Sequence, residues 1–189
     1  MGNRRDDLLD AAIGVLASSG MHGLTHRRVD AAAGVPAGTV SNHFRSRDAL
    51  LEAVVDRFAE RDRRAADALA ARHRPTTPGE LAVALTELAH VAVGEHREVT
   101  VARYAILVEA ATNPALRARL LTTGAGVNDW FMAWLRLAGS ADPHRDAPII
   151  MNHWTGVVLH EIAVPDPAFD PSAQIRALVT AVLTTGARA

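Results

Sequence analysis

A glycine and a proline, two residues apart, interrupt helical sequence in the run Ala33-Gly34-Val35-Pro36. Glycine accepts the positive φ angle of a tight turn, and proline suits the first turn of a new helix. Thr25 is a suitable N-cap for a short helix over residues 26–33, and a second short helix is expected over residues 36–44. The run therefore predicts two short helices that meet at a steep angle, and it excludes one continuous helix here.

The rest of the chain is also predicted to be helical. Hydrophobic residues make up 49% of the sequence and aromatic residues only 4%, because alanine is abundant, and alanine has the highest intrinsic helix propensity. Apolar residues recur at helical spacing, as in Leu81, Leu85 and Leu88. Further helices are expected at 4–19, 47–72, 81–92, 97–112, 114–138 (bent or interrupted at 124–126), 148–164 and 171–185, with a linker at 74–79 and a loop at 139–146.

The composition excludes several classes of protein. The chain has no Cys, which rules out disulfide scaffolds, iron–sulfur sites and thiol nucleophiles. Residues 1–7 lack the apolar core of a signal peptide, and no apolar run approaches the ~20 residues that cross a bilayer. A cytoplasmic protein with no membrane partner is therefore expected.

The net charge of −1 conceals an uneven distribution of charge. Residues 1–74 hold 12 Arg and 10 acidic residues, a net +2, whereas residues 75–189 hold 8 Arg and 11 acidic residues, a net −3. The mildly basic N-terminal part is compatible with nucleic-acid binding of modest nonspecific affinity. Because the chain has no Lys, contacts to phosphate are expected from Arg, backbone amides and short polar side chains.

Two short helices joined by a tight turn are typical of the helix-turn-helix motif, whose second helix enters the major groove of DNA. Val29, Val35 and Val40 supply the small apolar contacts between these helices, and the second helix carries short polar side chains. A plain helical hairpin is the alternative for this motif alone. The predicted DNA-binding residues are Thr25, Arg27, Arg28, Ala37, Gly38, Thr39, Ser41, Asn42, His43, Arg45 and Arg47.

The segment 8–58 resembles the DNA-binding domain of the TetR family of transcriptional repressors. The matching runs are Leu9-Asp10-Ala11-Ala12, Gly20, Gly23-Leu24-Thr25, Ala33-Gly34-Val35, Gly38-Thr39-Val40, His43-Phe44 and Ser46-Arg47-Asp48-Ala49-Leu50-Leu51. The resemblance implies an all-α protein with an N-terminal three-helix helix-turn-helix domain (1–46). It further implies a long connecting helix (47–74) and a larger helical domain (75–189) for ligand binding and dimerisation.

The resemblance also implies a function. A member of this family is expected to be a homodimer that binds a pseudo-palindromic double-stranded DNA operator as a repressor. A small-molecule effector in the C-terminal domain is expected to release it, and no cofactor is expected.

Several positions depart from the family's pattern. Pro36 stands where Ser or Thr is common, Ala37 replaces Lys or Arg, and Ser41 replaces a phosphate-contacting Tyr. Asp30 occupies a position that is usually Ala, either in an ion pair with a neighbouring Arg or at the rim of the packing. These departures leave open a helical protein-interaction module that has lost DNA binding.

The segments 148–164 and 171–185 predict a dimer interface. Apolar residues lie on nearly all sides of the first, so most of its surface has to be covered, and the second repeats this pattern. Two such helices and their two-fold copies make a four-helix interface, and a two-fold protein matches DNA half-sites about 34 Å apart. A monomeric core is the alternative. The predicted interface residues are Gly156, His160, Ile175, Leu178, Val179 and Val182.

Aromatic residues indicate where a ligand binds. Five of the eight aromatic residues lie between residues 104 and 154, and binding cavities are commonly aromatic with a few polar groups. An aromatic stripe at helical spacing is also common in a plain core, which is the alternative. The predicted ligand-binding residues are Tyr104, Glu109, Trp130, Trp134, His153 and Trp154.

The histidines do not form a metal motif or a catalytic motif. His153 and His160 are two helical turns apart, and no H-E-x-x-H spacing occurs. Catalytic residues and a metal site are therefore not expected. A small enzyme that uses His and carboxylate groups is a further alternative, against which the absence of phosphate loops and nucleophile elbows from the sequence counts.

Overall fold

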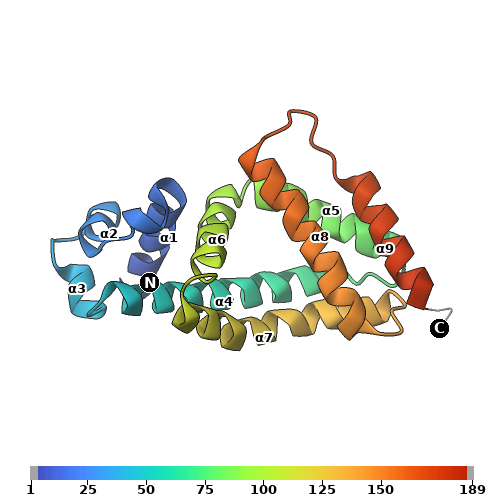
Figure 1. The fold of residues 1–189 in the computed structure, drawn as a ribbon, viewed down its shortest axis with the longest axis horizontal. Coiled ribbons are helices and arrows are strands. Elements are labelled where there is room, and N and C mark those ends of the chain that lie inside the picture. The colour runs from blue at the N-terminus through green and yellow to red at the C-terminus, as the bar shows by residue number, and fades with distance from the viewer. Residues whose placement is uncertain (1–3, 187–189) are drawn as a thin grey trace. The chain divides into compact units, whose positions relative to one another are not determined.

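The computed structural model describes the backbone of residues 4–186, and the side chains of these residues except 66, 124–128, 185 and 186. Within this range the chain forms helices and no strand (Figure 1), so the expected all-α fold is confirmed. The helices are α1 (Arg4–Gly23), α2 (His26–Ala32), α3 (Thr39–His43), α4 (Arg47–Arg72), α5 (Pro78–Val93), α6 (Arg97–Glu109), α7 (Pro114–Leu137), α8 (Pro143–Ala163) and α9 (Ser172–Gly186).

Spatial contacts group the chain into two compact units. The first comprises residues 4–63 and 98–125, and the second comprises residues 64–97 and 126–186. Helices α4 and α7 each contribute residues to both units, so the units do not follow chain order. The expected domains 1–46, 47–74 and 75–189 follow chain order and stay a prediction.

The core of the first unit joins the short helices to α1 and α4. Leu16 of α1, Val29 of α2, Val40 of α3 and Leu50 of α4 are all fully buried. Burial of a large aliphatic side chain stabilises a fold by about 1.5–3 kcal/mol relative to exposure. These residues hold the two short helices, which have too few turns to be stable alone.

Ion pairs attach α1 to α4 inside the first unit. The Arg57 guanidinium of α4 is only 9% exposed and donates to Asp10 of α1 at 2.8–2.9 Å and to Glu60 at 2.9 Å. The hydrogen bond from Arg57 holds the pKa of the Asp10 carboxyl below its ordinary value. Two more Arg–Asp pairs attach later helices to α4: Arg103 of α6 to Asp62, and Arg119 of α7 to Asp56.

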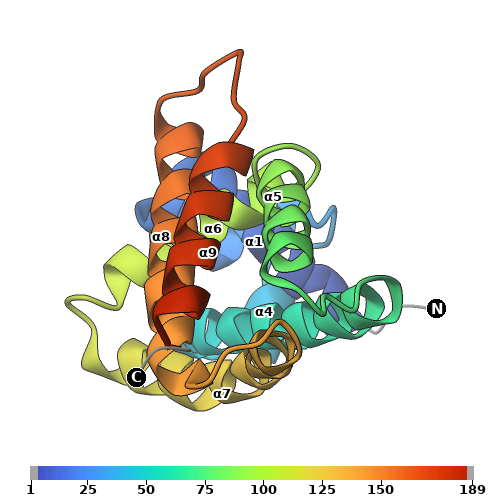
Figure 2. The ribbon, with the colours of Figure 1, turned by 90° about the vertical axis from the view of Figure 1, so that its right-hand side faces the viewer.

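In the second unit α5, α8 and α9 pack against one another (Figure 2). Leu81 and Leu85 of α5, Ile150 of α8, and Ile175 and Val179 of α9 are at most 2% exposed. The indole N–H of Trp154 on α8 donates to the Leu85 carbonyl at 2.9 Å, which fixes α8 to α5. The apolar faces of these helices therefore cover one another.

Two expected helix starts are wrong. Helix α8 begins at Pro143 and not near Pro148, because Asp142 caps it and accepts from the Arg145 N–H, so the stretch expected to be a loop is partly helical. Helix α3 begins at Thr39 and not at Pro36, because Gly38 has a left-handed backbone with φ of 91°. Helix α7 runs through residues 124–126 without an interruption. None of the helices in residues 4–186 combines the length and the hydropathy that a membrane crossing requires.

Candidate functional site

Helix α3 presents a polar face to the surface of the first unit. Val40 and the following Phe44 are 0% and 3% exposed, whereas Ser41, Asn42 and His43 are exposed. The three polar side chains are consecutive, and the apolar residues on either side anchor the helix to the core. This is the arrangement in which a helix offers hydrogen-bonding groups to the edges of bases.

The turn before α3 is built by backbone hydrogen bonds at the end of α2. The Val35 N–H donates to the Asp30 carbonyl at 3.0 Å, and the Gly34 N–H donates to the Ala31 carbonyl at 3.2 Å. Gly34 has φ of 63°, so this is the glycine-terminated helix end known as a Schellman motif. The tight turn expected from Gly34 is therefore present.

The Asp30 side chain lies at neither of the two places expected for it. Its carboxylate is buried, 4% exposed, and it accepts the N–H groups of Gly38 and Val40, both at 2.8 Å. Among the described residues it forms no ion pair with an Arg. Asp30 thus connects α2 to the start of α3 through backbone amides.

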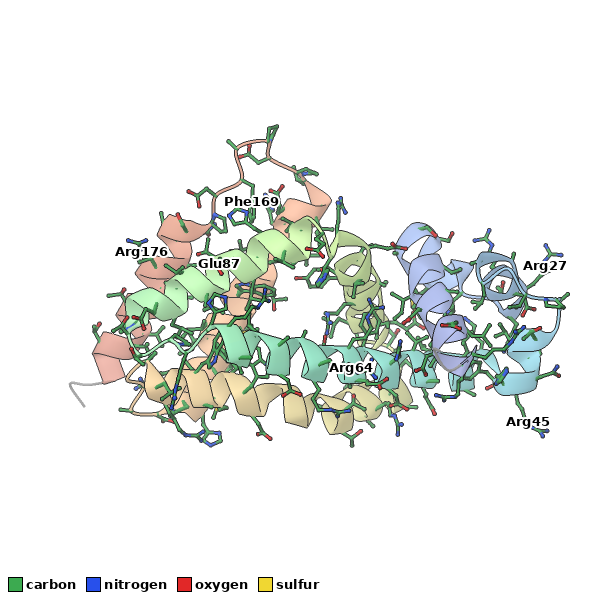
Figure 3. The ribbon with its side chains drawn as sticks, turned by 180° about the vertical axis from the view of Figure 1, so that it is seen from behind. Arg27, Arg45, Arg64, Glu87, Phe169 and Arg176 are labelled. Carbon is green, nitrogen blue, oxygen red and sulfur yellow. The ribbon has the colours of Figure 1, made fainter. Side chains whose placement is uncertain are left out.

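The four Arg residues predicted to contact phosphate differ in exposure and in the direction of their side chains. Arg27, Arg28 and Arg45 are exposed, and Figure 3 shows Arg27 and Arg45 extending away from the helices. Arg47 is half-buried, and its guanidinium donates to the Met21 carbonyl at 2.7 Å. Arg47 therefore holds the end of α1, a role that sequence reasoning did not assign to it.

The other predicted DNA-binding residues lie within the motif itself. Thr25 caps α2 by accepting the Arg28 N–H at 3.3 Å, and the Thr39 hydroxyl donates to the Pro36 carbonyl at 2.6 Å. Ala37 is exposed, and Gly38 is half-buried at the start of α3. The motif thus uses two of its hydroxyl groups for its own structure.

Sequence reasoning missed a contact that fixes the end of α3. The His26 imidazole of α2 lies 2.7 Å from the Phe44 carbonyl, and Arg5 of α1 lies over the Phe44 ring at 5.2 Å from its centroid. A hydrogen bond between residues 18 positions apart gives no periodic signal in a sequence.

The predicted ligand-binding residues fall into both units. Tyr104 and Glu109 lie on α6 in the first unit, and the other four lie in the second unit. Burial raises the pKa of the Tyr104 phenol to about 12. Within the second unit, the rings of Trp130 and Trp134 meet edge to face with their centroids 4.8 Å apart.

Among the described side chains of the second unit, two polar atoms are buried without a hydrogen-bond partner: Nε1 of Trp130 and Nε2 of His153. Most buried polar atoms in proteins are paired, so such atoms call for an explanation. The Trp154 N–H, by contrast, is bonded within the chain. Trp134 is 3% exposed and belongs to the core, whereas Trp130 is half-buried.

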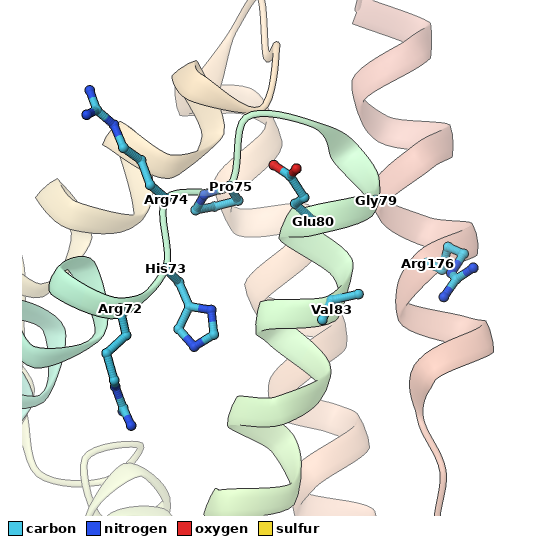
Figure 4. A pocket seen from close by; sticks show the side chains of 8 residues that line it. All are labelled: Arg72, His73, Arg74, Pro75, Gly79, Glu80, Val83 and Arg176. Carbon is cyan, nitrogen blue, oxygen red and sulfur yellow. The ribbon is translucent and has the colours of Figure 1, made fainter.

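Surface cavities of the second unit are lined in part by charged residues. One of about 450 Å³ is lined by Arg72, Arg74, Glu80 and Arg176 among others; Figure 4 shows Arg72 and Arg74 pointing away from each other. A second, of about 560 Å³, is lined by His153, Gly156 and His160 together with residues of the loop after α8. No motif in the sequence predicted that the loop after α8 would line a cavity. Within residues 4–186, no three His, Asp or Glu side chains gather as metal ligands.

The predicted dimer residues differ in exposure. Ile175 and Val179 are 2% and 0% exposed, and the face of α9 that carries them packs inside the second unit. Leu178 and Val182 are half-buried, while Gly156 and His160 of α8 are exposed. Of this set, Gly156 and His160 of α8 have the largest exposed fractions, and Leu178 and Val182 of α9 have less.

Family comparisons match two long segments of the chain. Residues 76–185 match the family described as "Tetracyclin repressor-like, C-terminal domain", and residues 8–54 match "Bacterial regulatory proteins, tetR family". No curated protein matches the chain.

Several solved structures are similar over almost their full length. The multidrug binding protein EbrR, complexed with ethidium, is 28% identical with a TM-score of 0.71, covering 95% of this chain and 98% of that one. A TetR-family member from Streptomyces coelicolor A3 is 26% identical with a TM-score of 0.70, covering 96% and 99%. A putative transcriptional regulator from Streptomyces coelicolor A3(2) is 22% identical with a TM-score of 0.75, covering 97% and 99%, which supports the fold alone.

Proposed function

Because this chain belongs to the TetR family of DNA-binding transcriptional regulators, which are not enzymes, we propose that it is a dimeric, ligand-responsive repressor. It binds a pseudo-palindromic operator in the cytoplasm through α3, and a small molecule bound in its C-terminal part releases it. Release follows if the effector favours a conformation of the dimer whose two α3 helices no longer fit the half-site spacing.

The observation that carries this proposal is the exposed polar face of α3. Ser41, Asn42 and His43 are exposed on a helix whose apolar residues are buried. Asn is well suited to adenine, and short hydroxyl and imidazole groups also bond base edges. Arg27, Arg28 and Arg45 border this face and supply the positive charge that phosphates attract.

The first experiment measures DNA binding. A gel-shift assay compares the DNA upstream of the protein's own gene with a random duplex at several salt concentrations. Substituting Asn42 or His43 by Ala should weaken preferred binding by about 1–3 kcal/mol for each hydrogen-bonded base that the side chain reads. His22→Ala is the matched control, since His22 is exposed at the end of α1. Equal affinity for all duplexes would favour the protein-interaction module instead.

The proposed effector is a planar aromatic molecule held beside Trp130. EbrR, at 28% identity, is complexed with ethidium and with proflavin, and this chain offers a half-buried indole next to the Trp134 ring. The unpaired Trp130 N–H adds a donor for a polar group on the ligand.

A substitution pair at Trp130 tests the effector proposal. Trp130→Ala removes the ring and should weaken proflavin binding by about 10-fold, whereas Trp130→Phe keeps a stacking surface and should stay within about 3-fold of wild type. Tryptophan fluorescence quenching gives both affinities. Unchanged binding by Trp130→Ala means that this ring is not a contact.

The proposed dimer face is the exposed side of α8, around Gly156 and His160. Ile149 and Leu159 on this helix are 44% and 43% exposed, which leaves apolar surface that a second copy would cover. Ile175 and Val179 are no longer part of the proposed face, because their side chains are occupied inside the chain.

A further inference from the structure

Asp30 is the one acidic residue between residues 26 and 43, and its side chain is almost completely buried. It lies on α2, is 4% exposed, and forms two hydrogen bonds to another element. Its Oδ2 accepts the Gly38 N–H and its Oδ1 accepts the Val40 N–H, both at 2.8 Å. Both carboxylate oxygens are therefore directed at the start of α3.

The start of α3 needs such an acceptor. The first amides of any helix have no partner within it, and a residue at the N-cap position usually supplies one from its side chain. Here the N-cap is Gly38, which has no side chain and makes no capping bond. Asp30 supplies from α2 what the cap residue cannot supply locally.

Three backbone donors at this helix end are engaged. The Thr39 N–H donates to the Pro36 carbonyl at 3.1 Å, so the amides of Gly38, Thr39 and Val40 are all engaged. A phosphate approaching these three amides would find their N–H groups already bonded to the Asp30 carboxylate and the Pro36 carbonyl. Contacts to phosphate therefore depend on exposed side chains such as Arg27 and Arg45.

We propose that Asp30 is the positioning residue of the recognition helix. By holding the first amides of α3, its carboxylate sets the orientation in which Ser41, Asn42 and His43 meet the base edges. DNA sequence preference depends on it more than nonspecific affinity does. The inference rests on the proposed function, because it assumes that α3 reads DNA.

The test compares Asp30→Asn with Asp48→Asn. Asparagine at position 30 keeps the shape of the side chain, but its amide nitrogen faces one backbone N–H, donor against donor. Asp48 is exposed in the first turn of α4, so its substitution removes the same charge from the same unit without touching α3. Melting temperature and amide hydrogen exchange are measured for both variants, with DNA affinity for preferred and random duplexes.

We expect Asp30→Asn to speed hydrogen exchange at Gly38 or Val40 by at least about 10-fold, and to lower the ratio of preferred to random DNA affinity by a similar factor. Amides in the middle of α1 and α4 should exchange as in wild type, which a general loss of stability would not allow. The salt dependence of binding should not change, because no phosphate contact is removed. If Asp30→Asn matches Asp48→Asn both in hydrogen exchange at the two amides and in the ratio of preferred to random DNA affinity, the inference is overturned.

Two outcomes separate this inference from the proposed function. If wild type prefers no sequence, the proposed function fails, while hydrogen exchange still decides whether Asp30 holds α3. If wild type prefers a sequence and Asp30→Asn keeps that preference, the inference fails alone. If Asp30→Asn does not fold, amide hydrogen exchange of the wild-type protein decides. Slow exchange at Gly38 and Val40 supports the contact, because a five-residue helix cannot protect its own first amides. Fast exchange at these amides overturns it.

Discussion

At the scale of single residues, several charged side chains in the first unit connect one helix to another. Arg57 is only 9% exposed, and its guanidinium nitrogens lie 2.8–3.3 Å from carboxylate oxygens of Asp6, Asp10 and Glu60. Its partners raise the pKa of its guanidinium above the ordinary value, chiefly through the hydrogen bond with Asp10. A buried cation of this kind has to keep its partners, because an unpaired buried charge is costly.

The Asp10–Arg57 pair predicts a pH dependence of stability. Asp10 has a lowered pKa in the folded protein, so the stability that it contributes is present above its unfolded pKa of about 3.8–3.9 and is lost as pH falls through the folded value. Asp10→Asn should lower the free energy of unfolding near pH 7 by about 1 kcal/mol or less, because the 41% exposed side chain is screened by solvent.

The difference between wild type and Asp10→Asn should shrink when urea unfolding is repeated near pH 3. Asp7→Asn serves as the control, since Asp7 is exposed in the first turn of α1. A difference that stays constant between the two pH values would show that the ion pair does not contribute as described.

At the scale of elements, the short helices of the motif depend on the turn between them. Gly34 has φ of 63°, and a Cβ added there would meet no atom within 4 Å. The need for glycine therefore comes from the backbone conformation and not from crowding. The sequence predicted this turn because the preference for glycine at positive φ is local.

Gly34→Ala should destabilise the first unit through that backbone conformation. A non-glycine residue in the left-handed region costs about 1–2 kcal/mol, and Asn tolerates it better than Ala does. Urea unfolding should therefore rank the proteins as wild type, then Gly34→Asn, then Gly34→Ala. Equal stability of the Ala and Asn variants would mean that the turn relaxes to another conformation.

At the scale of the whole molecule, neither the two units nor the proposed dimer face follows from the order of the helices along the chain. Residues 98–125 belong with the N-terminal helices, to which Arg103 and Arg119 attach them by ion pairs with α4. In the second unit the most apolar face of α9 is used internally, which leaves α8 to offer exposed apolar surface.

Gly156→Arg tests the proposed dimer. A Cβ at Gly156 meets nothing within 4 Å, so the chain itself tolerates a side chain there, whereas a second copy packed on α8 would not. Analytical ultracentrifugation should find a dimer for wild type and a monomer of unchanged helicity for the variant. Gly79→Arg is the matched control, since Gly79 is exposed outside the proposed face and its Cβ has no atom closer than 4.0 Å. If Gly156→Arg remains a dimer, the two chains do not pack across this glycine.

The sequence by itself determined the all-α fold, the turn at Gly34 and the family, because helix propensity, apolar spacing and turn chemistry act over a few residues. It did not determine where Asp30 points, since that carboxylate meets amides 8 and 10 residues away. Nor did it determine which face of α9 is covered, or that Arg47 holds the Met21 carbonyl. Those features depend on contacts between elements, and only the tertiary structure decides which of several apolar or charged surfaces becomes buried.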